Sequence, residues 1–448
     1  MGEDGLDGRL VPAVRARDAE AVRDLLVRGA DPDAVDTNGL PVLCVAVTAY
    51  DEQVAEALVE GGADPDRVLP DGTTPLGRAV DGGSPALFSA VLGKEPRLRL
   101  AEAAREQLLT SARSWYETGA AEELRRRTRA PGPAATVRVQ DGEYDWVDQV
   151  TLGGLVVRAG HGAILTALEW AFRVLTPVDE LIARAVEQPD EEHVDWSTVC
   201  WILTRRRSFE TWSAVVAHRH APDRAHRRFV ADYLWTRGVL GTDPYYEKKE
   251  SELLAAWAAE ETDGEMLAKV LKAFTEHDGP DQEATGLRHA DHPDPRVRRE
   301  VPHALCADYL PRTPAARAAL LTLIRDPDAE VQLRACTASM RDSALLPEIT
   351  QALLLAKAPD ADVRGAATVA LAGSPDRTPA VADALAASLG EDNQLVRLEA
   401  AYGLALRDDP RTAEAIERVG PLGDGFEHDH RADELSRWKW RKDNPAGE

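Results

Sequence analysis

The sequence has few cysteines, few methionines and few aromatic residues, and the first of these shortages excludes whole classes of protein. Its 448 residues include 4 cysteines and 3 methionines, and aromatic residues make up 5%. The cysteines are dispersed and form no C-x-x-C pair, so neither a disulfide framework nor a cysteine-based zinc site is expected. No apolar run reaches the roughly 18–20 residues that a membrane span needs. The N-terminus is acidic and lacks a signal-peptide layout, so we expect a cytoplasmic protein that does not associate with membranes.

Positive charge and catalytic motifs are also scarce. The net charge is −24, which disfavours a general affinity for nucleic acid because such binding depends on neutralising phosphates. No complete phosphate loop, G-x-S-x-G or H-E-x-x-H motif is present. Two histidine pairs, His289-x-x-His292 and His428-x-His430, are spaced for two metal ligands each, but no third ligand is fixed. We therefore predict no catalytic residue, no metal site and no cofactor.

Repetition is what the sequence does contain. A motif near the C-terminal end recurs around four valines, spaced by 34, 32 and 33 residues: Val297, Val331, Val363 and Val396. Each copy starts with a residue expected to cap a helix: Asp294, Asp328, Asp360 and Asn393. An apolar residue, alanine or glycine follows each valine four and seven positions later, which predicts a buried helical stripe. A period of this length indicates stacked helical units.

These units resemble HEAT repeats, in the form Asp360-x-x-Val-Arg-x-x-Ala-x-x-Ala-Leu371. The resemblance implies a curved α-solenoid whose inner helices present a groove. Arginines follow three of the valines directly, at Arg298, Arg364 and Arg397. Because they share one position in the repeat, we expect them to bond neighbouring repeats together.

A second repeat, of 33 residues, covers residues 10–93. Gly29-Ala-Asp-Pro-Asp33 recurs as Gly62-Ala-Asp-Pro-Asp66, and Asn38-Gly39 aligns with Asp71-Gly72. This pattern predicts pairs of short helices that end at a glycine and are joined by tight turns. It resembles the ankyrin repeat over about two and a half units, because the third unit lacks the Gly-Ala-Asp closure after Gly93.

The ankyrin resemblance implies a protein-binding module that uses turn tips and the inner helix face. The corresponding positions are Asp36, Thr37, Asn38, Thr48, Leu69, Pro70, Asp71 and Asp81. The alternative is that these residues are solvated turns. Fewer than three full repeats seldom stand alone, so the repeats are also expected to pack against the helices that follow.

The middle of the chain differs in composition from both repeats. Eight of the ten tryptophans lie between Trp115 and Trp257. Residues 136–157 alternate or are β-branched around Asp141-Gly142, which predicts a small β-hairpin insertion. Repeat position does not explain the run Arg205–Arg207, so these arginines, with Arg227 and Arg228, are a candidate patch for an anionic partner.

The C-terminal tail places Trp438 and Trp440 among basic residues. It is expected to be a capping helix, and the alternative is docking on the chain's own acidic surface or on a partner.

Together these observations predict an all-α helical-repeat solenoid with one small β insertion. The expected parts are ankyrin-like repeats (1–95), a Trp-rich connector with the β insertion (96–190), a HEAT-like solenoid (191–420) and a tail or capping helix (421–448). Alanine, arginine and aspartate are abundant and lysine is scarce, a composition typical of high-GC bacteria.

The expected function is a non-enzymatic scaffold or adaptor that binds another protein or peptide, and no oligomeric state is predicted. The alternative is a nucleic-acid-binding solenoid using Arg205–Arg207, which the net charge disfavours. A third reading, small-molecule binding as in HEAT-like phycobilin lyases, rests on analogy alone.

Overall fold

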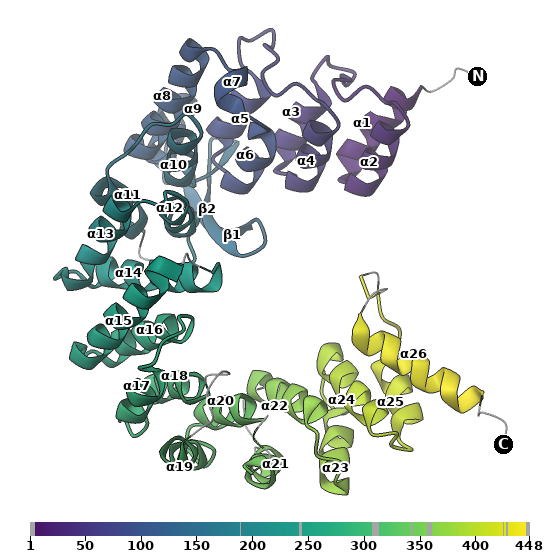
Figure 1. Ribbon diagram of the computed structural model, residues 1–448. Helices are drawn as coiled ribbons and strands as arrows, with labels where there is room; N and C mark the ends of the chain where they lie inside the picture. Colours follow the sequence, from purple (N-terminus) through teal and green to yellow (C-terminus); the bar gives the residue numbers. More distant parts are fainter. Residues whose placement is uncertain are drawn as a thin grey trace. The chain divides into compact units, whose positions relative to one another are not determined.

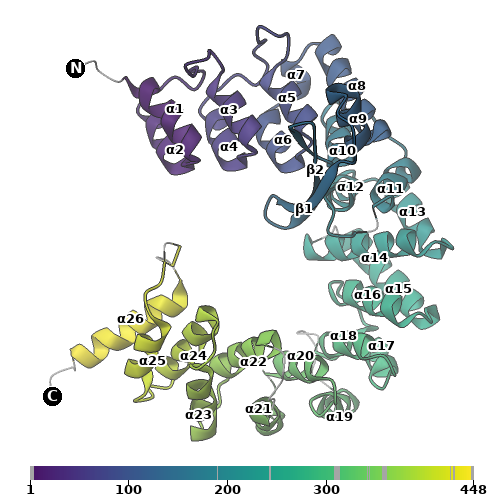
Figure 2. The same cartoon turned by 180° about the vertical axis from the view of Figure 1, so that it is seen from behind.

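The computed structural model describes residues 5–188, 190–241, 244–306, 313–340, 342, 344–355, 361–423, 425–426 and 429–444. The chain divides into two compact units, of which the first ends at Thr236 and the second begins at Arg237. Helices dominate both units (Figures 1 and 2), which confirms the predicted class of helical repeat fold. In the described part of the chain, no helix is long and apolar enough to cross a membrane.

The first unit opens with three helix pairs that stand side by side (Figure 1). They are α1 (Leu6–Ala16), α2 (Ala19–Val27), α3 (Val42–Ala49), α4 (Glu52–Glu60), α5 (Pro75–Gly82) and α6 (Pro85–Leu92). Four of these helices start at a side chain that accepts a hydrogen bond from a backbone N–H three residues later: Asp18, Asp51, Thr74 and Ser84. As predicted, the chain leaves α2 and α4 through left-handed glycines, Gly29 (φ +96°) and Gly62 (φ +100°).

The repeated Gly-Ala-Asp-Pro-Asp segments join one helix pair to the next. The carboxylate of Asp33 accepts a hydrogen bond from the backbone N–H of Asp64 in the following pair, at 2.9 Å. The carboxylate of Asp7 accepts one from the N–H of Asp31 in the same way, at 2.7 Å. The aspartates that carry the sequence repeat therefore hold adjacent units in register.

Later helices close the open side of the three pairs. The chain continues through α7 (Pro96–Arg99), α8 (Glu102–Thr118) and α9 (Ala120–Thr128), and α10 (His161–Ala171) follows the sheet. Leu108 of α8 and Ile164, Leu165 and Leu168 of α10 belong to the same hydrophobic core as the three pairs. The helices that follow the short array therefore cover it, as expected for an array of so few units.

The insertion is a three-stranded antiparallel sheet rather than the predicted hairpin. Its strands are β1 (Ala135–Asp141), β2 (Asp145–Leu152) and β3 (Leu155–Arg158), in the order β1-β2-β3. The prediction missed the second turn, at Gly153 (φ +58°) and Gly154 (φ +81°), which reverses the chain so that Val157 pairs with Val150. Two consecutive residues with positive φ form the tight turn that suits a twisted hairpin.

Helix pairs resume directly after the sheet. They are α10, α11 (Val178–Val186), α12 (Val194–Arg205), α13 (Phe209–Ala217), the short 3-10 helix η1 (His218–His220) and α14 (Arg224–Val239). Trp196 and Cys200 of α12 bond to Asp232 and Thr236 of α14, so these two helices run parallel. The alternation of stacked helices thus begins inside the segment predicted to be a connector.

The second unit consists of stacked helices only, within its described residues. They are α15 (Pro244–Glu260), α16 (Gly264–Thr275), α17 (Gln282–His289), α18 (Pro295–Leu305), α19 (Pro314–Leu323), α20 (Ala329–Ser339), α21 (Leu346–Leu355), α22 (Ala361–Gly373), α23 (Pro379–Ser388), α24 (Gln394–Leu406), α25 (Thr412–Val419) and α26 (His430–Asp443). Even-numbered helices from α16 onward pack on one another, and among the odd-numbered helices α15 packs on α17, α17 on α19 and α21 on α23.

The predicted stripe and caps explain this stacking. Val297 and Val331 are fully buried, Val363 and Val396 are half-buried, and Val396 packs against Gly365 of the preceding repeat. Asp294, Asp328 and Asn393 accept the expected backbone hydrogen bonds at the starts of their helices. Asp360 lies outside the described residues.

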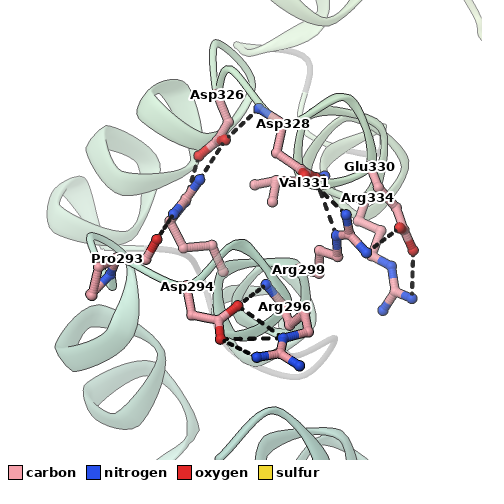
Figure 3. A network of polar contacts seen from close by, with 10 residues as sticks. Pro293, Asp294, Arg296, Arg299, Asp326, Asp328, Glu330, Val331 and Arg334 are labelled. Carbon is pink, nitrogen blue, oxygen red and sulfur yellow. Dashed lines mark hydrogen bonds and ion pairs between the residues drawn. The ribbon is translucent and has the colours of Figure 1, made fainter. Parts of the chain in front are cut away.

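Arg298 and Arg364 bond neighbouring repeats, as expected, whereas Arg397 donates to backbone carbonyl oxygens of Glu391, Asp392 and Arg418 around its own helix pair. Arg298 of α18 makes two parallel hydrogen bonds to Asp326 before α20, at 2.7 and 2.9 Å. Arg299 pairs with Asp328 at 2.9 Å and with Glu330 at 2.6 Å (Figure 3). In a later repeat Arg364 binds Glu391 through two bonds, at 2.9 and 3.0 Å. These arginines are therefore used within the chain.

Candidate functional site

The predicted turn-tip residues divide into buried and exposed positions. Asp36 is buried and accepts hydrogen bonds from the N–H groups of Asn38 and Leu40 and from Arg15. The bond from the Leu40 N–H is the largest of the effects that hold the pKa of Asp36 below its ordinary value. Leu69 is also buried. Both side chains therefore support the turns rather than project from them.

The other four tip residues are exposed: Thr37, Asn38, Pro70 and Asp71. Asp71 accepts hydrogen bonds from the N–H and the hydroxyl of Thr73, and it pairs with Arg78 at 2.8 Å. These interactions lower the pKa of Asp71 to about 2, with the Thr73 hydroxyl as the largest cause. In the second turn, Asp71 is therefore ionised and is held by Thr73 and Arg78.

The two predicted residues of the inner helix face, Thr48 and Asp81, line one hollow of about 240 Å³. Its remaining lining residues come from α3, α5, α8, α9 and β3: Val47, Tyr50, Arg78, Gly82, Trp115, Leu124, Arg127, Leu155, Val156 and Val157. We call this depression the Trp115 hollow. It lies where the sheet meets the inner helices, so the ankyrin-like pairs form only one of its walls.

Trp115 forms a rigid wall of the hollow. Its ring stacks on the ring of His161 with 4.7 Å between centroids and 4° between planes. The guanidinium group of Arg127 lies 4.3 Å from the Trp115 ring. Burial lowers the pKa of His161 to about 4, so this imidazole is neutral at physiological pH. The stack therefore carries one positive charge, on Arg127, at the hollow.

Asp81 organises the polar side of the hollow. Its carboxylate accepts hydrogen bonds from the Trp115 indole at 2.8 Å and from the Ser111 hydroxyl at 3.0 Å, and it pairs with Arg127 at 3.0 Å. Burial opposes ionisation, but the hydrogen bonds from Arg127, Trp115 and Ser111 outweigh it, so the pKa of Asp81 is lowered. Asp81 thus holds the side chains of Trp115 and Arg127 in place.

Tyr50 joins the sheet to the repeats at the mouth of the hollow. Its hydroxyl lies 2.9 Å from the carbonyl oxygen of Gly82 and 3.2 Å from that of Val156. Burial raises the pKa of Tyr50 to about 12, which keeps the hydroxyl proton available for these bonds. Leu155 and Val156 remain exposed beside it. The mouth therefore presents two apolar side chains on a strand that is hydrogen-bonded to Tyr50 of the repeats.

A larger depression, of about 680 Å³, lies between α1 and the first turn. Asp36 and Thr37 line it together with Asp7, Asp31 and Asp33. Asp7 and Asp33 already accept long-range backbone hydrogen bonds, and Asp36 accepts hydrogen bonds within its own turn. This depression is therefore largely a consequence of how the repeats join.

Of the predicted basic patch, only the central run Arg205–Arg207 remains a candidate for binding a partner. Arg227 donates to the carbonyl oxygens of Ala221 and Pro222, and Arg228 forms an ion pair with Glu191. Arg205 and Arg207 are exposed and Arg206 is half-buried, at and after the end of α12. The two outlying arginines thus serve the chain itself.

The C-terminal tail forms α26, which packs against α24. Trp438 is buried, and its indole donates to the carboxylate of Asp408 at 2.9 Å. Lys442 pairs with the same carboxylate, whereas Trp440 is 66% exposed. Of the two predicted docking residues, Trp438 therefore contacts its own chain and Trp440 faces solvent.

The histidine pairs do not assemble a metal site in the described part of the chain, where no group of three or more His, Cys, Asp or Glu side chains is arranged to hold a metal ion. His289 is buried, and the ring of His292 accepts a hydrogen bond from the N–H of Asp294. His428 lies outside the described residues.

Sequence reasoning missed the residues that complete the hollow, chiefly Tyr50, Trp115, Arg127 and Val156. No local motif marks them, because they come from separate elements that only the tertiary packing brings together. The one available signal was the concentration of tryptophan that begins at Trp115.

Comparisons with known proteins support the N-terminal assignment. Residues 10–99 match the family model of ankyrin repeats in three copies, so the third unit counts although it lacks the Gly-Ala-Asp closure. No curated protein matches the chain. The X-ray structure of the Escherichia coli protein YibA, a Northeast Structural Genomics Consortium target, has a TM-score of 0.41 and 16% identity, covering 59% of this chain and 98% of that chain. Residues 10–99 are therefore ankyrin repeats, a class of repeat that generally mediates protein–protein interaction.

Proposed function

We propose that this chain is a non-enzymatic scaffold whose first unit holds a segment of a partner protein in the Trp115 hollow. The observation that carries the proposal is that Thr48 and Asp81, two inner-face positions of the ankyrin repeats, share a hollow with exposed Leu155 and Val156. In this arrangement the sheet extends the inner face of the repeats.

The size of the hollow favours a protein partner over a metabolite. Small-molecule sites typically enclose roughly 300–1,000 Å³, and the Trp115 hollow has about 240 Å³. That volume suits a single inserted side chain. The flanking residues of the inserted segment would then contact the exposed tip around Pro70 and Asp71 or the edge of the sheet.

The chemistry of the lining favours an apolar anchor with an acidic neighbour. Val47, Leu155 and Val156 provide the apolar surface, while Arg78 and Arg127 stand at the rim. Both arginines already have carboxylate partners, at 2.8 Å for Arg78 and at 3.0 Å for Arg127. An acidic side chain of the partner would bind to these guanidinium groups alongside the carboxylates that they already contact. The apolar anchor would supply most of the binding energy.

Affinity purification from native lysate with quantitative mass spectrometry tests the proposal. The full-length chain is compared with the variant Leu155→Glu, which places a charge at the mouth of the hollow. Val27→Glu is the matched control, because Val27 is 89% exposed on α2 and does not line the hollow. We expect a partner that is retained by the wild-type chain and the control and lost by Leu155→Glu. An identical set of proteins from all three baits would reject the hollow as the site.

We further infer that the second unit is a HEAT-like solenoid. The stacking of its helices and the bonds from Arg298 and Arg364 to the next repeat support this inference. Repeats that contact only their neighbours should exchange amide hydrogens in steps, fastest at the ends of the array. A single cooperative exchange rate for the whole unit would contradict it.

A further inference from the structure

Helices α10 and α12 lie side by side and run in the same direction. At their N-terminal ends the N–H of Ala163 donates to the carboxylate of Asp195 at 2.5 Å. At their C-terminal ends Glu169 of α10 is close enough to Arg206 to act on its charge, although burial has the larger effect and lowers the pKa of Arg206. Residues that follow the two helices therefore share one end of the stack.

That end carries four arginines, which we call the arginine end: Arg173, Arg205, Arg206 and Arg207. The guanidinium group of Arg173 lies 5.3 Å from the ring centroid of Trp170, and that of Arg205 lies 5.8 Å from the ring of Trp201. Near its C-terminal end, each helix therefore carries a tryptophan with the guanidinium group of an arginine above its ring. Sequence reasoning found the three consecutive arginines and missed Arg173, which only the parallel packing brings to them.

Among the residues that the structure describes, none of these four guanidinium groups forms an ion pair or a hydrogen bond to another side chain. Elsewhere in this acidic chain many arginines do, such as Arg184, which binds the buried Glu169 at 3.1 Å. The Nε atom of Arg206 is buried without a hydrogen-bond partner in the same described residues. Among the described residues, the positive charge of the arginine end is thus not paired with a carboxylate, although Glu169 acts on Arg206 from a distance.

Helix geometry explains only part of this charge. A helix C-terminus carries a partial negative charge of about half an electron, which favours a nearby cation. Two such ends supply a charge of about −1, against four guanidinium groups. Most of the positive charge is therefore in excess of what the helices require.

Apolar residues adjoin the arginines. Leu175 is 78% exposed and Val174 is also exposed, directly after Arg173. Aliphatic side chains offer no stacking surface to a nucleobase, whereas nucleic-acid sites use open aromatic faces. Here an arginine lies over the ring of Trp170 and another over the ring of Trp201, which is 45% exposed, so each ring already has a cation on one face. The neighbourhood therefore suits a ligand that combines carboxylates with aliphatic groups.

We propose that the arginine end binds an acidic peptide segment of a partner protein, with carboxylates on Arg173, Arg205 and Arg207 and an aliphatic side chain over Leu175. Guanidinium groups bind carboxylates through paired hydrogen bonds, a geometry that lysine cannot provide. This surface is separate from the Trp115 hollow, so either proposal can fail without the other.

Fluorescence anisotropy with the full-length protein tests the proposal. The probe is a labelled synthetic peptide in which glutamates alternate with leucines. A peptide with glutamine in place of glutamate and an oligothymidine strand are the comparison ligands. The test variant is Arg205→Glu with Arg207→Glu. The matched control is Arg23→Glu in α2 with Arg28→Glu directly after it, because both arginines are exposed and the change in net charge is the same.

We expect the Arg205 and Arg207 variant to weaken binding of the glutamate peptide by about tenfold or more, because it replaces two attractive contacts with repulsive ones. The control should change the affinity by less than about twofold. The glutamine peptide should bind weakly to every form. Leu175→Ser should weaken binding of the peptide and leave any binding of oligothymidine unchanged.

Three results would overturn the proposal. One is no binding of the glutamate peptide at low salt, and another is an equal loss of binding in the test and control variants. The third is tighter binding of oligothymidine than of the peptide, lost on changing Arg205 and Arg207, which would assign the surface to nucleic acid. Circular dichroism of each variant establishes that the exposed substitutions leave the fold intact.

Discussion

The carboxylate of Asp141 accepts a hydrogen bond from the hydroxyl of Ser84, with 2.5 Å between the two oxygens. Ser84 starts α6 in the third ankyrin repeat, and Asp141 ends the first strand of the sheet. The second carboxylate oxygen accepts the N–H of Ala86 at 2.9 Å, and Arg158 completes the group with an ion pair at 2.5 Å. One aspartate thus fastens the sheet to the repeats and sets the wall of the Trp115 hollow.

Replacing Asp141 should therefore destabilise the first unit. In Asp141→Ala, Ser84 and Ala86 lose their acceptor and the mostly buried Arg158 loses its partner, which should cost about 3 kcal/mol. Denaturant unfolding followed by tryptophan fluorescence measures the change. Asp148→Asn on the exposed side of β2 is the control and should cost less than about 0.5 kcal/mol. Equal costs for the two variants would show that Asp141 does not fasten the sheet.

Asp195 should make the stability of the first unit depend on pH. Burial raises the pKa of Asp195 to about 7, whereas an aspartate in an unfolded chain titrates near 3.9. Between these values the folded chain holds a proton that the unfolded chain releases, so the contribution of this group to stability declines as pH rises from about 4 to 7.

The variant Asp195→Asn removes this dependence while keeping an oxygen acceptor for the N–H of Ala163. We expect the variant to gain stability over the wild-type chain as pH rises, by no more than about 1.4 kcal/mol per pH unit. Comparing both proteins at each pH cancels the opposite trend from His161, whose pKa burial lowers to about 4. A stability difference that is constant from pH 4 to pH 7 would contradict the assignment.

In the second unit, Arg298 should matter far more than Arg296, although the two are separated by one residue. Arg298 is largely buried and makes paired bonds to Asp326, while the side chain of Arg296 is 51% exposed and pairs with Asp294. Arg298→Ala should cost about 3 kcal/mol because it leaves a buried carboxylate unpaired. Arg296→Ala should cost less than about 1 kcal/mol. Thermal unfolding of the two full-length variants measures these stability losses. Similar losses would mean that the paired bonds between Arg298 and Asp326 do not stabilise the contact between repeats.

The tail offers a second matched pair. Trp438→Ala removes a buried ring and its bond to Asp408, so α26 should lose about 3–5 kcal/mol of docking free energy. Trp440→Ala removes an exposed ring and should leave docking unchanged. The hydrogen-exchange rates of the backbone amides of α26 measure directly how stably this helix is docked. Fast exchange in Trp440→Ala, or unchanged exchange in Trp438→Ala, would reverse the assignment of the two tryptophans.

Local chemistry made much of the fold predictable. Gly29 and Gly62 end their helices because glycine tolerates a positive φ, and Asp294 and Asp328 start theirs because a carboxylate accepts free backbone N–H groups. These effects act within a few residues and recur with the repeat. The turn at Gly153-Gly154 has the same local origin and was the signal for the missed third strand.

The candidate sites could not be predicted from local chemistry, because they depend on contacts between segments that are distant in the sequence. Asp81 and Trp115 are 34 residues apart and meet through a side-chain bond. Arg173 joins Arg205 only because α10 and α12 run parallel. Similarly, Asp36 and Leu69 occupy tip positions in sequence, but the turns direct both side chains inward.

The most direct test of the interaction function is photocrosslinking from within the Trp115 hollow. A photoreactive amino acid at Thr48, which lines the hollow, is compared with one at the exposed position Val27. We expect irradiation of cells to yield a discrete adduct from position 48 that is absent from position 27 and lost when Leu155→Glu is added. No adduct at position 48, or the same adducts from both positions, would contradict the assignment of the hollow as the site where a partner protein binds.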